Sequence, residues 1–348
     1  MDTFPSMTIA PKGRRVWALI LALGVTIAVV ASLDLGRVKA ELSEVSQAAL
    51  ALATLIYLPS WVLRGQRWRG IAQDLGDQLP LRGATAAATV GNMLNLLLPA
   101  KAGDLVWAHA AHIRWKVPYP RGIVGIFAGR VLDLLVLAGL GAATLLVYSP
   151  IAPGTRHAIW LSMVVGCVVA VLLYGVVIRL GIGKHLLVGS LKRFQSAHDA
   201  FIQAIQTLCS NPFRAALHVG LSLLIWALEF LVAWYLAVSM GFDLPWWSII
   251  IWIFAANLSK IIPLTPASMG TYEAAGAIAL GLAGASYDEA FALVLVEHLL
   301  KNGVNLLLGV LFLGIEDLPV RRTPLPSTQT ADTPSSLDQD TEDLGIPQ

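Results

Sequence analysis

Ionisable residues lie inside apolar stretches that are long enough to cross a membrane. Arg130 stands about nine residues into the stretch Gly122–Val147, which puts it roughly 13 Å from one face of a bilayer. Asp133 follows one helical turn later, and Glu297 and Lys301 lie at a comparable depth in a later stretch. Charge at this depth is costly and marks sites that bind ions, protons or polar headgroups. The basic residues suit a phosphate, and the acidic residues suit an amine or a proton.

A short pattern, Pro-Ala-x-x-Gly, occurs twice in apolar surroundings, at residues 99–103 and 266–270. A charged residue follows each proline after 31 positions: Arg130 (130 − 99) and Glu297 (297 − 266). Helices broken at matching places in two halves are typical of transporters built from inverted repeats. Asp104 and Thr271 share one offset from the two prolines, and we expect each to cap the short helix that follows. Two helix N-termini would then face the membrane interior and attract an anion such as phosphate.

The candidate residues come from the two breaks and from the spans that follow them. Four cations and four anions among them suggest a site that is neutral when empty. The last span also carries a polar stripe, which cannot face lipid and is either a binding surface or a structural seam between helices. We expect these residues to bind substrate: Lys101, Asp104, Arg130, Asp133, Lys260, Thr271, Glu273, Glu297, His298 and Lys301. We expect these to shape the breaks: Asn92, Pro99, Gly103, Asn257, Pro263, Pro266 and Gly270.

The composition identifies the class of protein that must position these residues. Hydrophobic residues make up 56% of the 348 residues and charged residues 13%, about half the usual charged share of a globular domain. We therefore expect an all-α polytopic membrane protein. Six full spans are legible, with two further apolar stretches that run into the breaks: Val16–Leu33, Ala48–Leu63, Gly122–Val147, Ile159–Leu180, Ala215–Val238 and Ala290–Ile315, then Ala84–Leu98 and Trp246–Ile262.

Positive charge predicts the orientation of the spans. Basic residues at 12–15 place the N-terminus in the cytoplasm, and Arg64, Arg67 and Arg69 place the end of the second span there. Each broken stretch must then leave from and return to one side, as a re-entrant hairpin, and the second half is upside down. The expected organisation is a cytoplasmic N-terminus (1–15), a first repeat (16–147), a second repeat (159–315) with a cytoplasmic connector (184–211), and a disordered cytoplasmic tail (319–348).

These motifs resemble the transmembrane region of the bacterial lysylphosphatidylglycerol synthetase/flippase and the wider flippase-like family. The matching text is Asn92…Pro99-x-x-x-Gly103-Asp104, Arg130-x-x-Asp133 and Pro263-x-x-Pro266-x-x-x-Gly270-x-x-Glu273, within about residues 10–315. The resemblance implies movement of polar-headed lipids between leaflets. The chain departs from the family pattern at Gly129, where a glutamate is usual, and at His298 and Lys301, where an arginine is usual. Either departure suggests a different lipid.

We therefore expect a lipid flippase of the bacterial inner membrane, with both termini in the cytoplasm, that moves a lipid with a phosphate in its headgroup. We expect no enzymatic activity, because no Asp-x-Asp motif stands at the membrane face of a predicted span and no large soluble loop is visible. We also expect no cofactor, no metal and no nucleic-acid partner; the partners would be the membrane lipid and an enzyme that makes it. Three alternatives stay open: an accessory subunit of an envelope assembly complex, a lipid-linked glycosyltransferase, and an ion-coupled carrier of a water-soluble solute.

Overall fold

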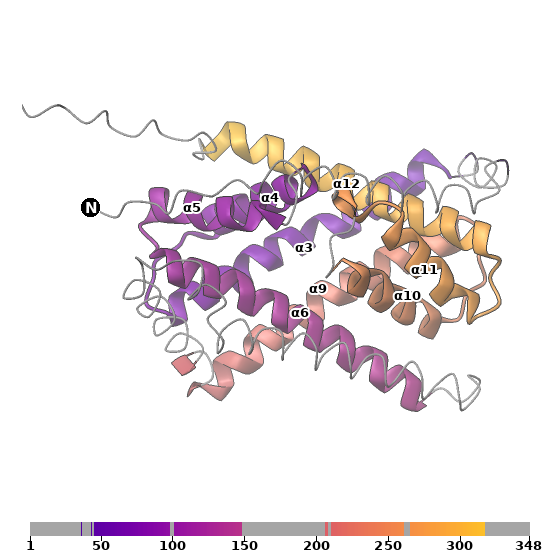
Figure 1. Ribbon diagram of the computed structural model, residues 1–348, viewed down its shortest axis with the longest axis horizontal. Coiled ribbons are helices and arrows are strands. Elements are labelled where there is room, and N and C mark those ends of the chain that lie inside the picture. The colour runs from indigo at the N-terminus through magenta and orange to yellow at the C-terminus, as the bar shows by residue number, and fades with distance from the viewer. Residues whose placement is uncertain are drawn as a thin grey trace, which may run out of the picture.

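A computed structural model shows an all-α polytopic membrane protein (Figure 1). It describes residues 36, 43, 45–97, 101–147, 206–207, 210–260 and 265–316, and contains no strand within these ranges. Four helices are long and apolar enough to cross a membrane: α3, α6, α9 and α12. The elements are α3 (Gln47–Asp74), α4 (Leu81–Leu97), α5 (Gly103–Trp115), α6 (Tyr119–Val147), α9 (Pro212–Ser239), α10 (Trp246–Ser259), the 3-10 turn η2 (Pro266–Ser268), α11 (Thr271–Gly281) and α12 (Tyr287–Glu316).

Several predicted segments lie outside the described residues. They are the N-terminus 1–15, the spans Val16–Leu33 and Ile159–Leu180, most of the connector 184–211, the tail 319–348, and the prolines Pro99 and Pro263. The boundaries of the two repeats therefore stay predictions.

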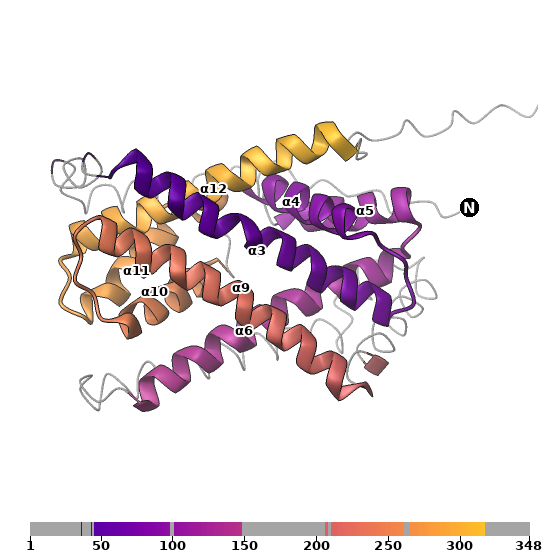
Figure 2. The same ribbon diagram turned by 180° about the vertical axis from the view of Figure 1, so that it is seen from behind.

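The described elements follow the same order twice. A long helix, two short helices and a long helix appear as α3 to α6 and again as α9 to α12. Figures 1 and 2 show that α3 and α9 run in opposite directions, as do α6 and α12. The pair α4–α5 lies toward one end of the long axis, and the pair α10–α11 lies toward the other. This arrangement supports the inverted repeat and its re-entrant hairpins, which remain predictions.

The two breaks share an unusual backbone conformation. Lys101 and Ser268 are both the third residue of the Pro-Ala-x-x-Gly pattern, and their φ angles are 54° and 58°. Left-handed conformations are uncommon for residues other than glycine. The two φ angles agree at matching positions of the pattern, and Ala267, which precedes Ser268, is left-handed as well, with a φ of 51°.

Each break then requires its glycine for a different reason. A Cβ atom on Gly103 would lie 2.0 Å from the backbone oxygen of Gly91, so only glycine lets α5 start this close to α4. Gly270 has a φ of 84°, a conformation that glycine adopts without steric cost. The second break also contacts α4, which brings the two helix pairs together.

Four apolar clusters hold the described helices together, and two of them are the largest. The larger of these two joins α3, α6, α9, α10, α11 and α12 around fully buried residues such as Trp252, Leu236 and Leu293. The smaller one packs α4 and α5 against α3 and α6 through Trp68 and Trp107, whose rings meet edge to face. Small residues along α4 permit this close approach of helices.

The second span is longer than the sequence indicated. The interpretation of Arg64, Arg67 and Arg69 as loop residues is wrong, because α3 continues without interruption to Asp74. Arg64 and Arg67 are tolerated within the helix because carboxylates on other helices pair with them. The charges of Arg64, Arg67 and Arg69 therefore do not support the predicted orientation of the spans, and a labelling experiment can test that orientation directly.

We expect a cysteine at Asp243, between α9 and α10, to react with an impermeant thiol reagent from outside, and a cysteine at Arg114 not to react. Both native side chains are exposed, and the inverted-repeat hypothesis places them on opposite sides of the membrane. Labelling in intact cells and in permeabilised cells measures this difference. Labelling of both cysteines from one side would contradict the inverted topology.

Candidate functional site

The first tip, defined by Asn92, Asn95, Lys101, Asp104 and Arg130, surrounds the break between α4 and α5. Arg130 on α6 donates from Nη2 to Asp104 Oδ1 and to Asn92 Oδ1, at 3.2 Å each. Asn95 Nδ2 also donates to Asp104 Oδ1, at 2.8 Å. The Arg130 side chain is 39% exposed and that of Asp104 is 24% exposed. The charged groups of this tip are therefore held in place but remain accessible.

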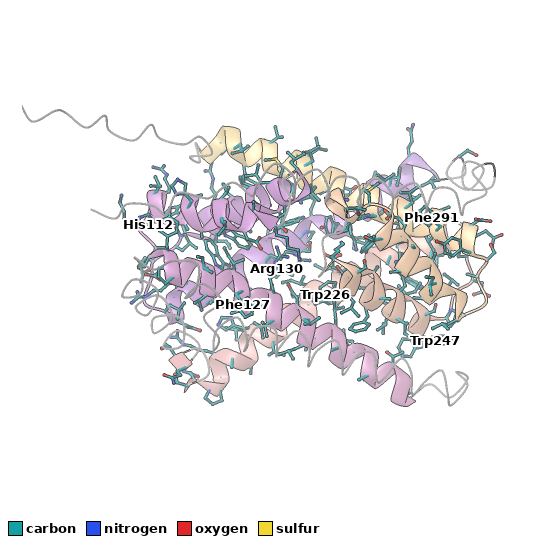
Figure 3. All side chains as sticks on the ribbon, in the orientation of Figure 1. His112, Phe127, Arg130, Trp226, Trp247 and Phe291 are labelled. Atoms are coloured by element: carbon teal, nitrogen blue, oxygen red, sulfur yellow. The ribbon has the colours of Figure 1, made fainter. Side chains whose placement is uncertain are left out.

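Figure 3 shows Arg130 near the middle of the molecule. Its second terminal nitrogen, Nη1, forms no hydrogen bond with any described residue. Lys101 begins the turn that precedes α5, is half-buried, and pairs with no carboxylate among the residues that the structure describes. The first tip thus offers two cations to a ligand against one carboxylate.

Asp133 lies one helical turn after Arg130 on α6, but it pairs with a different arginine. Asp133 receives both terminal nitrogens of Arg67, at 2.6 and 2.9 Å, and the indole N–H of Trp226 at 3.1 Å. Arg67 also donates to Ser222 Oγ at 2.6 Å. Asp133 is therefore a buried structural residue of the helix bundle, whereas Arg130 belongs to the first tip.

A chain of ion pairs continues from Asp133 through the interior. Arg64 lies 3.7 Å from Asp133 Oδ2 and donates to Glu229 Oε1 at 2.5 Å. Lys301 then pairs with both Glu229 and Glu297. We call these six residues, Arg67, Asp133, Arg64, Glu229, Lys301 and Glu297, the ion-pair chain. It links α3, α6, α9 and α12, and its three cations balance its three anions.

The second tip, defined by Lys260, Gly270, Tyr272, Glu273 and His298, surrounds the break between α10 and α11. His298 Nδ1 and Glu273 Oε1 are 2.6 Å apart, and the N–H of Gly270 donates to Glu273 Oε2 at 2.6 Å. The Tyr272 ring stacks on the His298 ring with centroids 4.2 Å apart, and Lys260 Nζ lies 4.0 Å from the Tyr272 ring centroid. Tyr272 Oη donates to Glu297 Oε2 at 3.0 Å, which joins this tip to the ion-pair chain.

The expected capping roles of Asp104 and Thr271 are wrong. The residues that precede α5 and α11 are Ala102 and Gly270, and Thr271 Oγ1 donates to the carbonyl of Ser268 instead. Glu273 fills the N-terminus of α11 with its own carboxylate, and Asp104 occupies the first turn of α5. Because acidic side chains already stand at both helix N-termini, the side-chain cations are better candidates than the helix ends for holding an anion.

The two asparagines of the breaks have backbone partners. Asn92 Nδ2 donates to the carbonyl of Ala88 at 2.9 Å, and Asn257 Nδ2 donates to the carbonyl of Ile253 at 2.8 Å. Each of these hydrogen bonds runs to the carbonyl four residues earlier in the same helix, near the end at which that helix stops at a break. Asn257 therefore has a structural role, while Asn92 also orients Arg130.

The sequence-based selection missed Arg64, Arg67 and Glu229. Glu229 had a clear signal, since it is a lone acid inside the apolar span Ala215–Val238. With the three added, the polar interior holds six cations and five anions, a net charge of +1 with His298 neutral. The sequence had suggested a site with no net charge when empty. The empty site instead carries one excess positive charge, which favours an anion.

Three relatives share much of this chain. A protein named glycosyltransferase AglD from Haloferax volcanii is 29% identical over 89% of this chain, which spans 56% of that protein's length. A UPF0104 membrane protein from Methanocaldococcus jannaschii is 25% identical over 66% of this chain and 97% of the relative. Another UPF0104 membrane protein, from Methanothermobacter thermautotrophicus, is 22% identical over 76% of this chain and 82% of the relative.

The similarity to a protein named a glycosyltransferase contradicts our expectation that the chain is not an enzyme. That expectation rested on the lack of a large soluble loop and of an Asp-x-Asp motif at the membrane face of a predicted span. The argument fails because the matched region is about half of the relative, so a membrane region of this kind also occurs in a protein named for enzymatic activity.

A family model matches a range of residues that includes the whole polar interior. The family described as the lysylphosphatidylglycerol synthase TM region matches residues 15–309, which include both breaks, both tips and the ion-pair chain. This confirms the resemblance seen in the motifs: the chain belongs to the family of the lysylphosphatidylglycerol synthase TM region.

Proposed function

We propose that this protein binds the phosphate of a lipid headgroup at the first tip and moves the lipid between the two leaflets. The observation that carries the proposal is Arg130, a cation in the middle of the membrane region that is 39% exposed and keeps one terminal nitrogen free of described partners. An arginine presents parallel donors to a phosphate. Lys101 adds a second cation beside it.

The charges and the location favour a lipid over a soluble solute. The polar interior has one excess positive charge, which a headgroup with a single phosphate neutralises. The residues of the first tip lie on or between helices whose outer faces are apolar. The lipid tails would stay in the bilayer against these faces while the headgroup enters the polar interior. The family described as the lysylphosphatidylglycerol synthase TM region supports a lipid-related role. Lys260, Glu273 and His298 at the second tip are the next contacts that we propose for the headgroup.

We expect Arg130→Ala to lower the rate of lipid movement about tenfold or more while the protein still inserts and folds, because the arginine is partly exposed and its removal strands little buried charge. Arg130→Lys should restore only part of the rate, since an ammonium lacks the parallel donors. The measurement is loss of leaflet-specific quenching in proteoliposomes that carry fluorescent phosphatidylglycerol, phosphatidylethanolamine or polyprenyl phosphate.

The matched control is Arg121→Ala, which removes an exposed arginine from the start of the same helix, where it pairs with Asp77. It should leave lipid movement unchanged. Full movement of every probe by Arg130→Ala would contradict the assignment of Arg130, and no movement of any probe by the wild type would contradict the proposed function.

A second candidate function is supported by the relative named a glycosyltransferase. In that case the first tip would hold the phosphate of a lipid carrier during transfer of a sugar. The test incubates the protein with polyprenyl phosphate and a panel of nucleotide sugars, and measures glycolipid formation. Both candidate functions need an enzyme that makes the lipid, and we propose such an enzyme as a partner. The orientation and the particular membrane stay predictions.

A further inference from the structure

The second tip contains a buried histidine and a buried carboxylate, His298 and Glu273, that do not belong to the ion-pair chain. Glu273 is fully buried and His298 is 2% exposed. Both carboxylate oxygens of Glu273 are engaged, one by the Gly270 N–H and one by His298 Nδ1, at 2.6 Å each. With Glu273 ionised, Nδ1 carries a hydrogen and donates it, so Nε2 holds the free lone pair of the ring. A proton that reaches this pair therefore binds at Nε2 of His298.

The other titratable groups around this pair are held in contacts of their own. Glu297 and Glu229 share Lys301, and Tyr272 donates its hydroxyl to Glu297. Three of these groups thus stay within the neutral ion-pair chain. The titratable and charged groups that face the pair are Lys260 directly after α10, Tyr272 on α11, Glu297 and Lys301 on α12, and Glu229 on α9.

The two tips differ by one charge. The first tip carries Lys101, Arg130 and Asp104, which sum to +1. The second tip carries Lys260 and Glu273, which sum to zero while His298 is neutral. A headgroup with one negative charge is therefore neutralised at the first tip, and leaves an uncompensated negative charge at the second tip. Uncompensated charge inside a membrane protein is strongly unfavourable.

We propose that Glu273 and His298 form a proton-binding site, and that one proton accompanies an anionic headgroup to the second tip. This inference rests on the proposed lipid movement. Protonated His298 gives the second tip a charge of +1, equal to that of the first tip. His298 and Lys260 both contact the ring of Tyr272, so the added charge lies in the same cluster as the cation that would meet the headgroup. By thermodynamic linkage, binding of the anion must then increase the affinity of the protein for the proton, and binding of the proton must increase its affinity for the anion.

The test measures movement of fluorescent phosphatidylglycerol in proteoliposomes at pH 7.5 and pH 5.5 on both sides. We expect the wild-type rate to rise about fivefold or more at the lower pH. His298→Gln should show the same rate at both pH values, whatever its rate at pH 7.5, because the proton-binding ring is gone. Glu273→Gln, which keeps an oxygen acceptor for the Gly270 N–H, should also lose the rise.

The matched control is His218→Gln. His218 is also buried and also pairs with a carboxylate, Asp74, at 2.8 Å, but it belongs to neither tip. This variant should keep the full rise. A rise in His298→Gln equal to that of the wild type, or loss of the rise in His218→Gln alone, would overturn the proton site.

A binding measurement separates failure of this inference from failure of the proposed function. Short-chain phosphatidylglycerol is added to the detergent-solubilised protein in weak buffer with a pH indicator. Proton uptake in the wild type, and none in His298→Gln, supports the proton site even where no lipid crosses the membrane. Lipid binding without proton uptake overturns the proton site and leaves lipid movement standing. No binding at all overturns both.

Discussion

Asp133→Ala should destabilise the protein by about 3–5 kcal/mol, because it leaves a buried arginine without its counter-charge. Asp133 is buried and accepts both terminal nitrogens of Arg67 as well as the indole N–H of Trp226. Its removal strands Arg67, whose remaining described acceptor is Ser222. Thermal unfolding in detergent, followed by loss of tryptophan fluorescence, measures the effect.

Two further variants make this prediction specific. Asp133→Leu combined with Arg67→Met removes the whole pair and should recover most of the lost stability, since no unpaired charge is left behind. Asp104→Ala is the control, because its ion pair with Arg130 is partly exposed, and it should cost about 1 kcal/mol or less. Equal losses for Asp133→Ala and Asp104→Ala would contradict the structural assignment of Asp133.

Glu229→Ala should destabilise the protein by a similar amount, about 3–5 kcal/mol. Glu229 is the central anion of the ion-pair chain and receives Arg64 on one oxygen and Lys301 on the other. Its loss removes one carboxylate from each of two cations, Arg64 on α3 and Lys301 on α12, and leaves the ion-pair chain with one excess positive charge. The same unfolding measurement applies, with lipid movement recorded on whatever protein remains folded.

Glu229→Gln separates charge from shape in this prediction. The amide keeps the volume and one acceptor oxygen, so any loss that it shares with Glu229→Ala comes from the missing charge. We expect it to recover less than half of the stability. A Glu229→Gln variant as stable as the wild type would show that the chain does not depend on this ionic contact.

The sequence was most informative where a pattern is local. The Pro-Ala-x-x-Gly repeat predicted both breaks, and the matching left-handed residues Lys101 and Ser268 show the same geometry in each. Helical spacing placed Glu297, His298 and Lys301 on one face of α12, and all three are buried. These predictions succeeded because neighbouring residues in one helix determine the face on which a side chain lies.

Partnerships between distant segments could not be predicted in this way. Arg130 and Asp133 are one turn apart, so spacing paired them, but Arg67 lies 66 residues before Asp133 and only the tertiary fold brings it near. Arg64 and Arg67 looked like loop residues because clustered positive charge usually marks a cytoplasmic loop. The rule failed here because buried carboxylates on α6 and α9 compensate the two arginines.

The ion-pair chain divides the molecule into parts that differ in mechanical freedom. It fastens the four long helices to one another, so that they form a rigid frame. The pair α10–α11 is attached to this frame by two buried contacts with α12, through Tyr272 and Glu273. The pair α4–α5 packs against α3 and α6 through the apolar cluster of Trp68 and Trp107, and its ion pair with α6, that of Asp104 with Arg130, is accessible. A headgroup that takes Arg130 away from Asp104 would leave this pair held by apolar packing and by the contact of His109 with Tyr119, so binding would loosen one side of the frame and not the other.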